Sequence, residues 1–115
     1  MARKRSPLLA APFQGKWRIA EMDAWPDDVV DLLGPASLSI KGQEGEMRFI
    51  AVTAWLDTRY DARNGGPIAE FSWEGVDEGD PRSGRGWLVP ATAGRLVGHI
   101  FFHNGDYSAF VCEPE

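Results

Sequence analysis

The dipeptide Asn104-Gly105 constrains the fold of this chain more than any other local feature. A two-residue type I′ hairpin turn needs positive φ at both central positions, and asparagine followed by glycine meets that need best. Segments rich in apolar and aromatic residues flank the dipeptide. The dipeptide therefore predicts an antiparallel hairpin in which His103 faces Asp106 and His99 faces Phe110.

Both faces of this predicted hairpin carry large apolar side chains. Phe101 falls on the same face as His99, whereas Ile100, Phe102 and Tyr107 fall on the other. A barrel face that contacts water is normally more polar than either of these. The excess predicts cover by a helix, by the N-terminal segment or by a second subunit, and we expect a homodimer.

Strand-like segments separated by turn residues occupy most of the remaining chain. They cover residues 14–22, 36–41, 46–55 with a continuation over 56–62, 67–75, 86–90, 95–103 and 106–112. Short strands at this spacing, in hairpin order, are typical of antiparallel β-barrels. The sequence therefore predicts a mainly β fold, an antiparallel meander of seven or eight strands that forms a small barrel or a strongly curled sheet.

One short helix is predicted after the first strand, over residues 23–34. Pro26 suits the first helical position, and a glycine-proline pair follows as a stop signal. The predicted apolar stripe of this helix consists of Val29, Leu32 and Leu33. Because the helix is short, we expect packing on the sheet to hold it.

A chain of 115 residues builds one hydrophobic core. Residues 1–12 hold basic charges and two prolines without a periodic pattern. We therefore expect a flexible basic N-terminal segment over residues 1–12 and a single β-barrel-like domain over residues 13–115. No apolar run reaches the roughly 18 residues that a membrane-spanning helix needs, so no membrane partner is expected.

The net formal charge is −5, and removing the contribution of Arg3, Lys4 and Arg5 leaves −8 on the rest of the chain. Such a body lacks the positive field that attracts phosphates, so nucleic acid is not an expected partner. Cys112 is the only cysteine, which rules out an internal disulfide and favours a reducing cytoplasm.

Two resemblances accompany these patterns. Gly15-Lys16-Trp17 resembles the Gly-x-Trp element of lipocalins and related calycin barrels, which implies the closed base of an up-and-down barrel that holds a small apolar ligand. The chain also resembles a group of short, uncharacterised bacterial proteins, and this resemblance implies a natural bacterial protein without implying an activity. It is carried by the segments GKWRI, GPA, FIAV, EFSWEG, SGRGW and GHIFFH.

A ligand pocket is predicted where aromatic and charged residues gather on neighbouring strands. An aspartate and an arginine on the strand face that carries a tryptophan suit either the polar mouth of a pocket or an outer face. His99 is the expected polar centre, because a neutral imidazole both donates and accepts hydrogen bonds. The candidate ligand-binding residues are Trp55, Asp57, Arg59, Trp73, Glu74 and His99.

No metal site or cofactor is predicted. His99 and His103 are placed roughly 13 Å apart along a strand that rises about 3.3 Å per residue, too far to share an ion. The carboxylates near residue 77 are expected to form a solvated loop with local ion pairs. Asp77 and Asp80, which flank Gly79, are the better candidates if a cation binds there.

The favoured function is a non-catalytic β-barrel that binds a small ligand or a protein partner. The first alternative is a small acid/base enzyme that uses His99 with Glu74 or Asp57. The second alternative is an acidic protein-interaction or inhibitor module, whose negative body would steer it towards a basic surface. An aromatic pocket with ionisable groups would favour the ligand-binding barrel or the acid/base enzyme. A filled interior with a flat acidic face would favour the interaction module.

Overall fold

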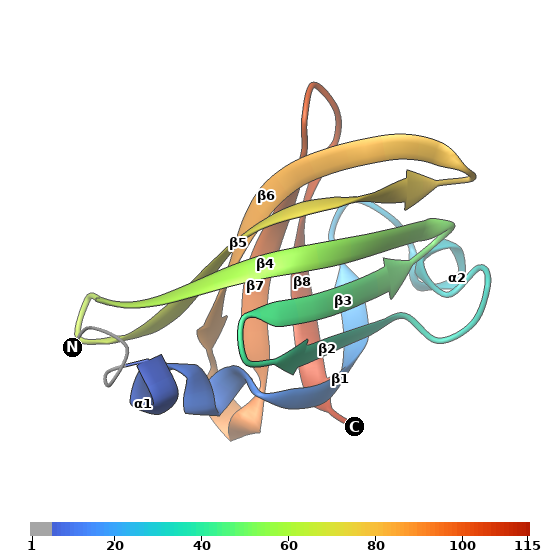
Figure 1. Ribbon diagram of the computed structural model, residues 1–115. Helices are drawn as coiled ribbons and strands as arrows, with labels where there is room; N and C mark the ends of the chain where they lie inside the picture. Colours follow the sequence, from blue (N-terminus) through green and yellow to red (C-terminus); the bar gives the residue numbers. More distant parts are fainter. Residues whose placement is uncertain (1–5) are drawn as a thin grey trace.

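The computed structural model describes residues 6–115. Eight antiparallel strands follow one another as a meander, and the last strand pairs back with the first, so the sheet closes into a barrel (Figure 1). The predicted fold is confirmed. The strands are β1 (Gly15–Met22), β2 (Ser37–Lys41), β3 (Glu44–Phe49), β4 (Val52–Arg63), β5 (Gly66–Asp77), β6 (Asp80–Pro90), β7 (Leu96–Phe102) and β8 (Tyr107–Pro114).

Buried and exposed side chains alternate along β4 and β5, as the sequence predicts, because successive residues of a strand point to opposite faces. The inward residues of these two strands are Ala54, Leu56, Thr58, Ala69, Phe71 and Trp73. The outward residues are Trp55, Asp57, Arg59, Glu70, Ser72 and Glu74. The inward side chains join those of the other strands in one hydrophobic core.

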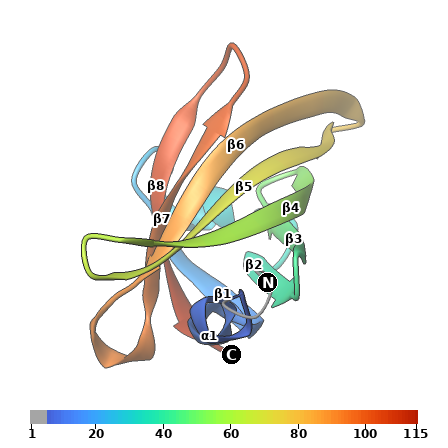
Figure 2. The same ribbon diagram turned by 60° about the vertical axis from the view of Figure 1, so that its left-hand side comes forward.

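The base of the barrel is closed by the N-terminal part of the described chain. Helix α1 (Ser6–Ala10) and the 3-10 turn η2 (Ala11–Phe13) lie at the lower end of the barrel in both ribbon views, near the C-terminus (Figures 1 and 2). Phe13 is fully buried, and its ring centroid lies 5.7 Å from that of Tyr60. The indole N–H of Trp17 donates a hydrogen bond of 3.0 Å to the Phe13 carbonyl.

The charged part of the predicted basic segment, Arg3 to Arg5, lies outside the described residues. Its apolar continuation forms the helical turns that cover the base. A second 3-10 turn, η3 (Thr92–Gly94), connects β6 to β7 at the same end. The other end of the barrel carries the connections β1–β2, β3–β4, β5–β6 and β7–β8, and we call this end the mouth.

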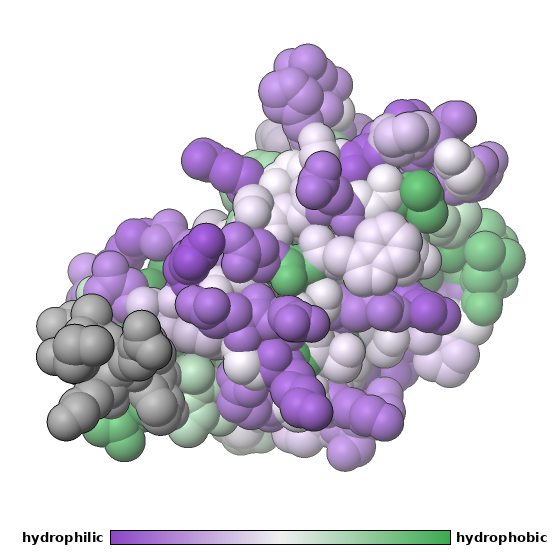
Figure 3. All heavy atoms as spheres, viewed as in Figure 1, coloured by the Kyte–Doolittle hydropathy of each residue, from purple (hydrophilic) through white to green (hydrophobic). Residues whose placement is uncertain are grey.

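The predicted helix over residues 23–34 is shorter than expected. Only α2 (Asp27–Val30) is helical, and Pro26 is its extended N-cap rather than its first residue. The predicted apolar stripe is wrong as well, because Leu32 and Leu33 are 59% and 77% exposed while Val30 is buried. In Figure 3 green surface gathers at the right-hand end, over this segment.

The hairpin at Asn104-Gly105 differs from its predicted register by one residue. His99 pairs with Ala109 rather than Phe110, and Asp106 lies opposite Phe102 rather than His103. Asn104 has positive φ, but Gly105 does not, so the turn is not type I′. Relative to the prediction, the shift exchanges the two faces of β8, so Tyr107 rather than Ser108 lies on the outward face with His99 and Phe101.

A turn that the sequence did not reveal separates β3 from β4. The strand predicted to run through residues 46–62 instead reverses at Ile50-Ala51, so that Phe49 pairs with Val52. Ile50 has φ of 54°, a conformation that β-branched residues rarely adopt, and its N–H donates to the Val30 carbonyl at 2.8 Å. A tertiary hydrogen bond therefore stabilises this turn, which has none of the usual turn-forming residues.

Gly84 and Gly86 are strand residues of β6. A Cβ atom on Gly86 would overlap the Phe71 ring, and one on Gly84 would crowd the Trp73 indole. The two glycines leave room for inward aromatic rings on the neighbouring strand. A bulge at Ala20 interrupts the alternation of side chains along β1. Met22 rather than Glu21 is therefore the next inward residue after Ile19.

The outer surface of the barrel divides into a charged part and an uncharged part. Figure 3 views the charged part, where hydrophilic surface covers much of β3 to β5. Among the outward residues of β7 and β8 the only charged side chain is that of Glu113, near the end of β8. The uncharged outward residues are Val97, His99, Phe101, Tyr107, Ala109 and Val111. We call this surface the β7–β8 face.

Candidate functional site

The six residues predicted to bind a ligand do not share one pocket. Trp55, Asp57 and Arg59 point outward from β4, and Glu74 and His99 point outward from β5 and β7. Trp73 is 2% exposed and points into the barrel, where its indole N–H donates to the Phe101 carbonyl at 3.2 Å. Trp73 is therefore separated from the other five residues, because it lies in the barrel interior and they lie on the outer face.

The three β4 residues form an exposed polar strip. Trp55 lies between two carboxylates, opposite Glu46 on β3 and Glu74 on β5. Arg59 forms an ion pair with Asp57, with Nη2 at 3.0 Å from Oδ2. Because both side chains of this pair are exposed, solvent screens most of the electrostatic attraction between them.

Asp57 and Arg59 also line a shallow hollow on the outer face with a volume of about 410 Å³. The same hollow contacts Arg85, Trp87 and Phe101 across β6 and β7. Two of the predicted site residues, Asp57 and Arg59, therefore lie near the Trp87 and Phe101 rings rather than near Trp73. Glu74 and Trp55 are not among its lining residues.

His99 belongs to a ladder of stacked rings on the outer surface. Its ring centroid lies 5.0 Å from that of Trp87 and 5.8 Å from that of Phe101, with interplanar angles of 24° and 19°. Tyr107 extends the ladder beyond Phe101 at 6.1 Å. No hydrogen bond among the described residues joins His99 to Glu74 or Asp57, so the acid/base arrangement considered from the sequence is not assembled.

The mouth of the barrel holds a cup with a volume of about 670 Å³. All four mouth connections contribute to it, so residues far apart in the sequence meet there only because the barrel closes. The lining residues are Trp25, Val29, Phe49, Ile50, Val52, Asp77, Glu78, Pro81, Arg82, Ser83, Phe102, His103, Asn104, Gly105 and Asp106. We call this space the mouth cup.

Aromatic rings form the floor of the mouth cup. Phe102 makes edge-to-face contacts with Trp25 and Phe49, with ring centroids 6.5 Å and 6.1 Å apart. Below them the Trp73 ring lies 5.0 Å from Phe102. Such edge-to-face contacts are a favoured geometry for aromatic pairs. The floor therefore separates the cup from the filled core.

The rim of the mouth cup is polar and mostly acidic. Asp77, Glu78 and Asp106 supply carboxylates, and Arg82 and His103 supply basic groups. None of these carboxylates forms an ion pair or a side-chain hydrogen bond within the described chain, and Arg82 instead donates to the Pro81 carbonyl at 2.9 Å. The local ion pairs expected for this loop are therefore not formed within the described chain.

The β5–β6 turn brings two like charges together at this rim. Glu78 and Gly79 have φ of 52° and 85°, the positive values that a type I′ turn requires, and Asp77 consequently pairs with Asp80. Like charges directly opposite each other on neighbouring strands are unfavourable. No group of three or more potential metal ligands occurs among residues 6–115.

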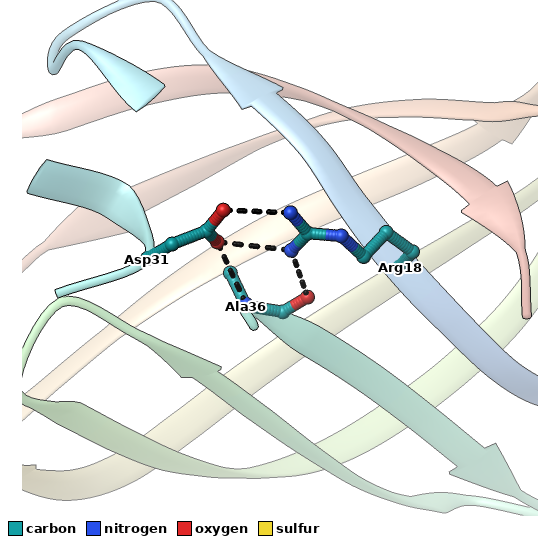
Figure 4. A network of polar contacts seen from close by, with 3 residues as sticks. All are labelled: Arg18, Asp31 and Ala36. Atoms are coloured by element: carbon teal, nitrogen blue, oxygen red, sulfur yellow. Dashed lines mark hydrogen bonds and ion pairs between the residues drawn. The ribbon is translucent and has the colours of Figure 1, made fainter. Parts of the chain in front are cut away.

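An ion pair fixes the segment that carries Trp25 and Val29 (Figure 4). The Arg18 guanidinium binds the Asp31 carboxylate through two contacts, of 2.9 Å and 2.6 Å, and also donates to the Ala36 carbonyl at 3.1 Å. Asp31 Oδ1 in turn accepts the Ala36 N–H at 2.9 Å. The Arg18 side chain, then the Ala36 N–H, lower the pKa of Asp31 to about 2.

The start of the same segment is tied to β8. The Asp23 carboxylate accepts the Ala109 N–H at 2.8 Å and the Ser108 hydroxyl at 3.0 Å. These two hydrogen bonds, that of Ala109 first, lower the pKa of Asp23. The β1–β2 connection is thus attached at both of its ends, and the wall of the mouth cup that it forms has a defined position.

Cys112 is not placed for nucleophilic chemistry. It is fully buried in the core, and desolvation raises the pKa of its thiol to about 12. A thiol in this state is a poor nucleophile because the thiolate is the reactive form.

Sequence reasoning missed the aromatic floor. Trp25, Phe49 and Phe102 lie next to connections, where neither strand alternation nor a motif distinguishes them from ordinary core residues. The usable signal was indirect: each lies within a few residues of a turn, and the turns after β1, β3, β5 and β7 must meet at one end of an eight-stranded meander. The acidic cluster at Asp77 was recognised, but as a solvated loop.

Comparison with family models, with curated proteins and with solved structures found no match. Residues 6–115 contain no helix of the length and hydrophobicity required to traverse a bilayer. The functional reading of the chain therefore depends on the geometry of the mouth cup and of the outer surface.

Proposed function

We propose that this protein is a small-molecule-binding barrel that holds its ligand in the mouth cup. The observation that carries the proposal is the cavity of about 670 Å³ between an aromatic floor and a polar rim. Ligand sites typically occupy about 300–1,000 Å³ and combine mostly apolar walls with a few polar groups that orient the ligand. The volume of the cup lies within this range, and the cup combines an aromatic floor with a rim that is more polar than that of a typical site.

The closed base supports the choice of the mouth. Phe13 fills the opposite end, and the inner half of the barrel is packed with fully buried side chains. A ligand therefore approaches from the mouth and rests on Trp25, Phe49 and Phe102. Of the six residues predicted from the sequence, Trp73 supports this floor from below. The other five face the outer surface, where a role for them in binding stays a prediction.

A non-catalytic role fits the arrangement around the cup better than acid/base chemistry. Catalysis by proton transfer needs a base within hydrogen-bond reach of substrate and usually a second group that orients it. His103 lines the cup, but among residues 6–115 its side chain has no hydrogen-bond partner, and its N–H to the Ser83 carbonyl is a backbone contact of 2.7 Å. The calycin resemblance of Gly15-Lys16-Trp17 would place ligand binding at the same end.

Native mass spectrometry tests the proposal with a matched pair of variants. Phe102→Ala removes part of the floor, whereas Phe101→Ala removes the adjacent ring, which points outward. We expect small molecules carried through purification, or taken up from a mixed fragment library, to bind the wild type and Phe101→Ala. Phe102→Ala should lose them while its circular dichroism spectrum stays β-rich. Equal retention by both variants would contradict binding in the mouth cup.

The β7–β8 face favours self-association as a second function. Apart from Glu113 near the end of β8, it lacks the charges that cover β3 to β5, and it displays Phe101 and Tyr107 at 40% and 68% exposure. Aromatic residues are enriched and charged residues depleted at the centres of protein interfaces. A surface with a single charge on an acidic protein also lets two copies approach with little local charge repulsion. A homodimer built through this face is the partner that we propose.

Sedimentation at micromolar concentration tests the dimer. The wild type should sediment with twice the monomer mass, and Phe101→Asp should be monomeric because it places a charge in the face. Trp55→Asp is the matched control, since it charges an equally exposed aromatic position on β4. A wild type that remains monomeric would remove the proposed partner without affecting the mouth cup.

A further inference from the structure

The charges around the mouth cup are unbalanced in a way that specifies a ligand class. Three carboxylates line it, those of Asp77, Glu78 and Asp106, against one guanidinium, that of Arg82. Asp80 adds a fourth carboxylate at the register position opposite Asp77. Because the described chain pairs none of these carboxylates with a basic side chain, their negative potential is directed at whatever occupies the cup.

The aromatic floor also attracts cations. A cation above the face of a tryptophan or phenylalanine ring, within about 6 Å of its centroid, is attracted by the ring quadrupole. Trp25 and Phe102 supply two partly exposed rings to the cavity, with planes inclined by 75°. Phe49 packs against Phe102 with its own ring buried, so it supports the floor.

The shape of the site favours an organic cation over a metal ion. A bare divalent cation needs several oxygen ligands converging within about 2.6 Å. No group of three or more potential metal ligands lies close enough together for this among residues 6–115. An alkyl- or arylammonium ion instead satisfies both parts of the cup, because its carbon skeleton contacts the rings while the charge faces the carboxylates.

We propose that the ligand of the mouth cup is a small organic cation, an amine or quaternary ammonium compound with an apolar portion. This inference rests on the proposed function and adds the charge of the ligand to it. An anionic ligand would place its charge near Asp77, Glu78 and Asp106, with only Arg82 and His103 in compensation. A neutral ligand would leave the rim carboxylates without a role in binding.

Three probes of similar size and different charge test this inference: phenethylammonium, 2-phenylethanol and 3-phenylpropanoate. Each is titrated into the full-length protein while the indole N–H signal of Trp25 is followed by NMR. A unit charge about 6 Å away in water changes affinity roughly threefold, so the carboxylates together should favour the cation over the alcohol by about tenfold. The preference should fall as salt is raised, because screening shortens the reach of the charges.

A charge-matched pair of variants locates the effect. Glu78→Gln with Asp106→Asn removes two carboxylates from the cup, and Glu44→Gln with Glu115→Gln removes two from exposed positions near the base. The first double variant should lose most of the preference for phenethylammonium and keep its affinity for 2-phenylethanol. The second should behave as the wild type. Equal losses in both would assign the preference to net charge and overturn a cation site in the cup.

The outcomes separate this inference from the proposed function. If all three probes bind with similar affinity at Trp25, the mouth cup is a ligand site but the inference of a cation fails. Tighter binding of 3-phenylpropanoate would also overturn the inference and would identify Arg82 as the dominant charge. If no probe shifts the Trp25 signal, both the inference and the proposed function are contradicted.

Discussion

The rings of Trp73 and Phe102 meet edge to face, with centroids 5.0 Å apart and planes inclined by 84°. Trp73 is part of the filled interior, and Phe102 is part of the floor of the mouth cup. This contact therefore marks the boundary between the core that stabilises the fold and the cavity to which we assign binding. A residue at such a boundary contributes to both.

Phe102→Ala should destabilise the protein more than Phe101→Ala. The Phe102 ring contacts Trp25, Phe49 and Trp73, so its removal leaves a space among three aromatic rings. We expect a loss of about 2 kcal/mol for the half-buried Phe102 and less than about 1 kcal/mol for the exposed Phe101. Urea denaturation measures both, and equal losses would contradict the assignment of Phe102 to the floor.

The Arg18–Asp31 pair should make stability depend on acid pH. The pKa of Asp31 is lowered to about 2 from an ordinary 3.8, so its contribution is complete above about pH 4 and is lost as pH falls towards 2. Both side chains are about one-third exposed, and solvent screening limits the contribution to about 1 kcal/mol. Asp31→Asn should therefore lower stability by about this amount at pH 7 and have little effect at pH 2.

The exposed pair of Arg48 and Glu46 provides the control for that experiment. Its side chains are 64% and 36% exposed, and its ion pair joins two residues of β3 rather than the segment that Asp31 fixes. Glu46→Gln should change the free energy of unfolding by less than about 0.5 kcal/mol at either pH. If Asp31→Asn were as mild as this control, the ion pair would not hold the wall of the mouth cup.

Thr58→Val should stabilise the barrel. The Thr58 side chain is fully buried on β4, and its hydroxyl has no hydrogen-bond partner among residues 6–115. Replacing an unsatisfied buried hydroxyl by a methyl group of similar size removes a desolvation penalty, for which we expect a gain of about 1 kcal/mol. Thermal unfolding measures the change. A loss of stability would mean that the hydroxyl has a partner, such as a buried water molecule.

Cys112 should react with a thiol reagent only after unfolding. Burial raises the pKa of the thiol to about 12, so the thiolate is scarce at pH 8, and the reagent has no access to the core. The reaction rate in the native state should therefore follow the rate of opening and rise steeply in urea. Rapid labelling of the native protein would show that β8 opens readily at this position.

The sequence predicts the barrel because strand alternation is a local property. Whether Trp55 and Asp57 share a face, or Phe71 and Trp73 do, depends only on the two-residue period of a strand. The structure confirms that each of these two pairs shares a face. The order of the strands follows from turn residues such as Asn64-Gly65, both with positive φ. These signals suffice for a meander, and they leave both a closed barrel and a strongly curled sheet open.

Features that depend on tertiary contact could not be predicted. The turn at Ile50 contains neither glycine nor proline and is held by a hydrogen bond to Val30, which lies twenty positions earlier. Asn104-Gly105 has the composition of a type I′ turn, yet the chain adopts a longer loop there, with the His103 N–H bonded to the Ser83 carbonyl on the neighbouring hairpin. In both places a contact between hairpins overrides the local preference.

The mouth cup was out of reach of sequence reasoning for the same reason. Its lining comes from four connections that are adjacent only in the closed barrel. Alternation places Phe102 and His99 on opposite faces of β7, but it does not tell which of these faces is the inner one. The predicted site residues instead describe the outer face of β4 and β5 because alternation locates that face without any knowledge of closure.

An NMR fragment screen that follows two indole N–H signals tests the central claim most directly. Trp25 lines the mouth cup, whereas Trp55 is exposed on the outer face of β4 and belongs to the site expected from the sequence. Binding in the mouth cup predicts that fragments shift the Trp25 signal, together with backbone signals near Glu78 and Phe102, and leave Trp55 unchanged. Fragments that shift Trp55 alone, or that shift neither signal, would contradict it.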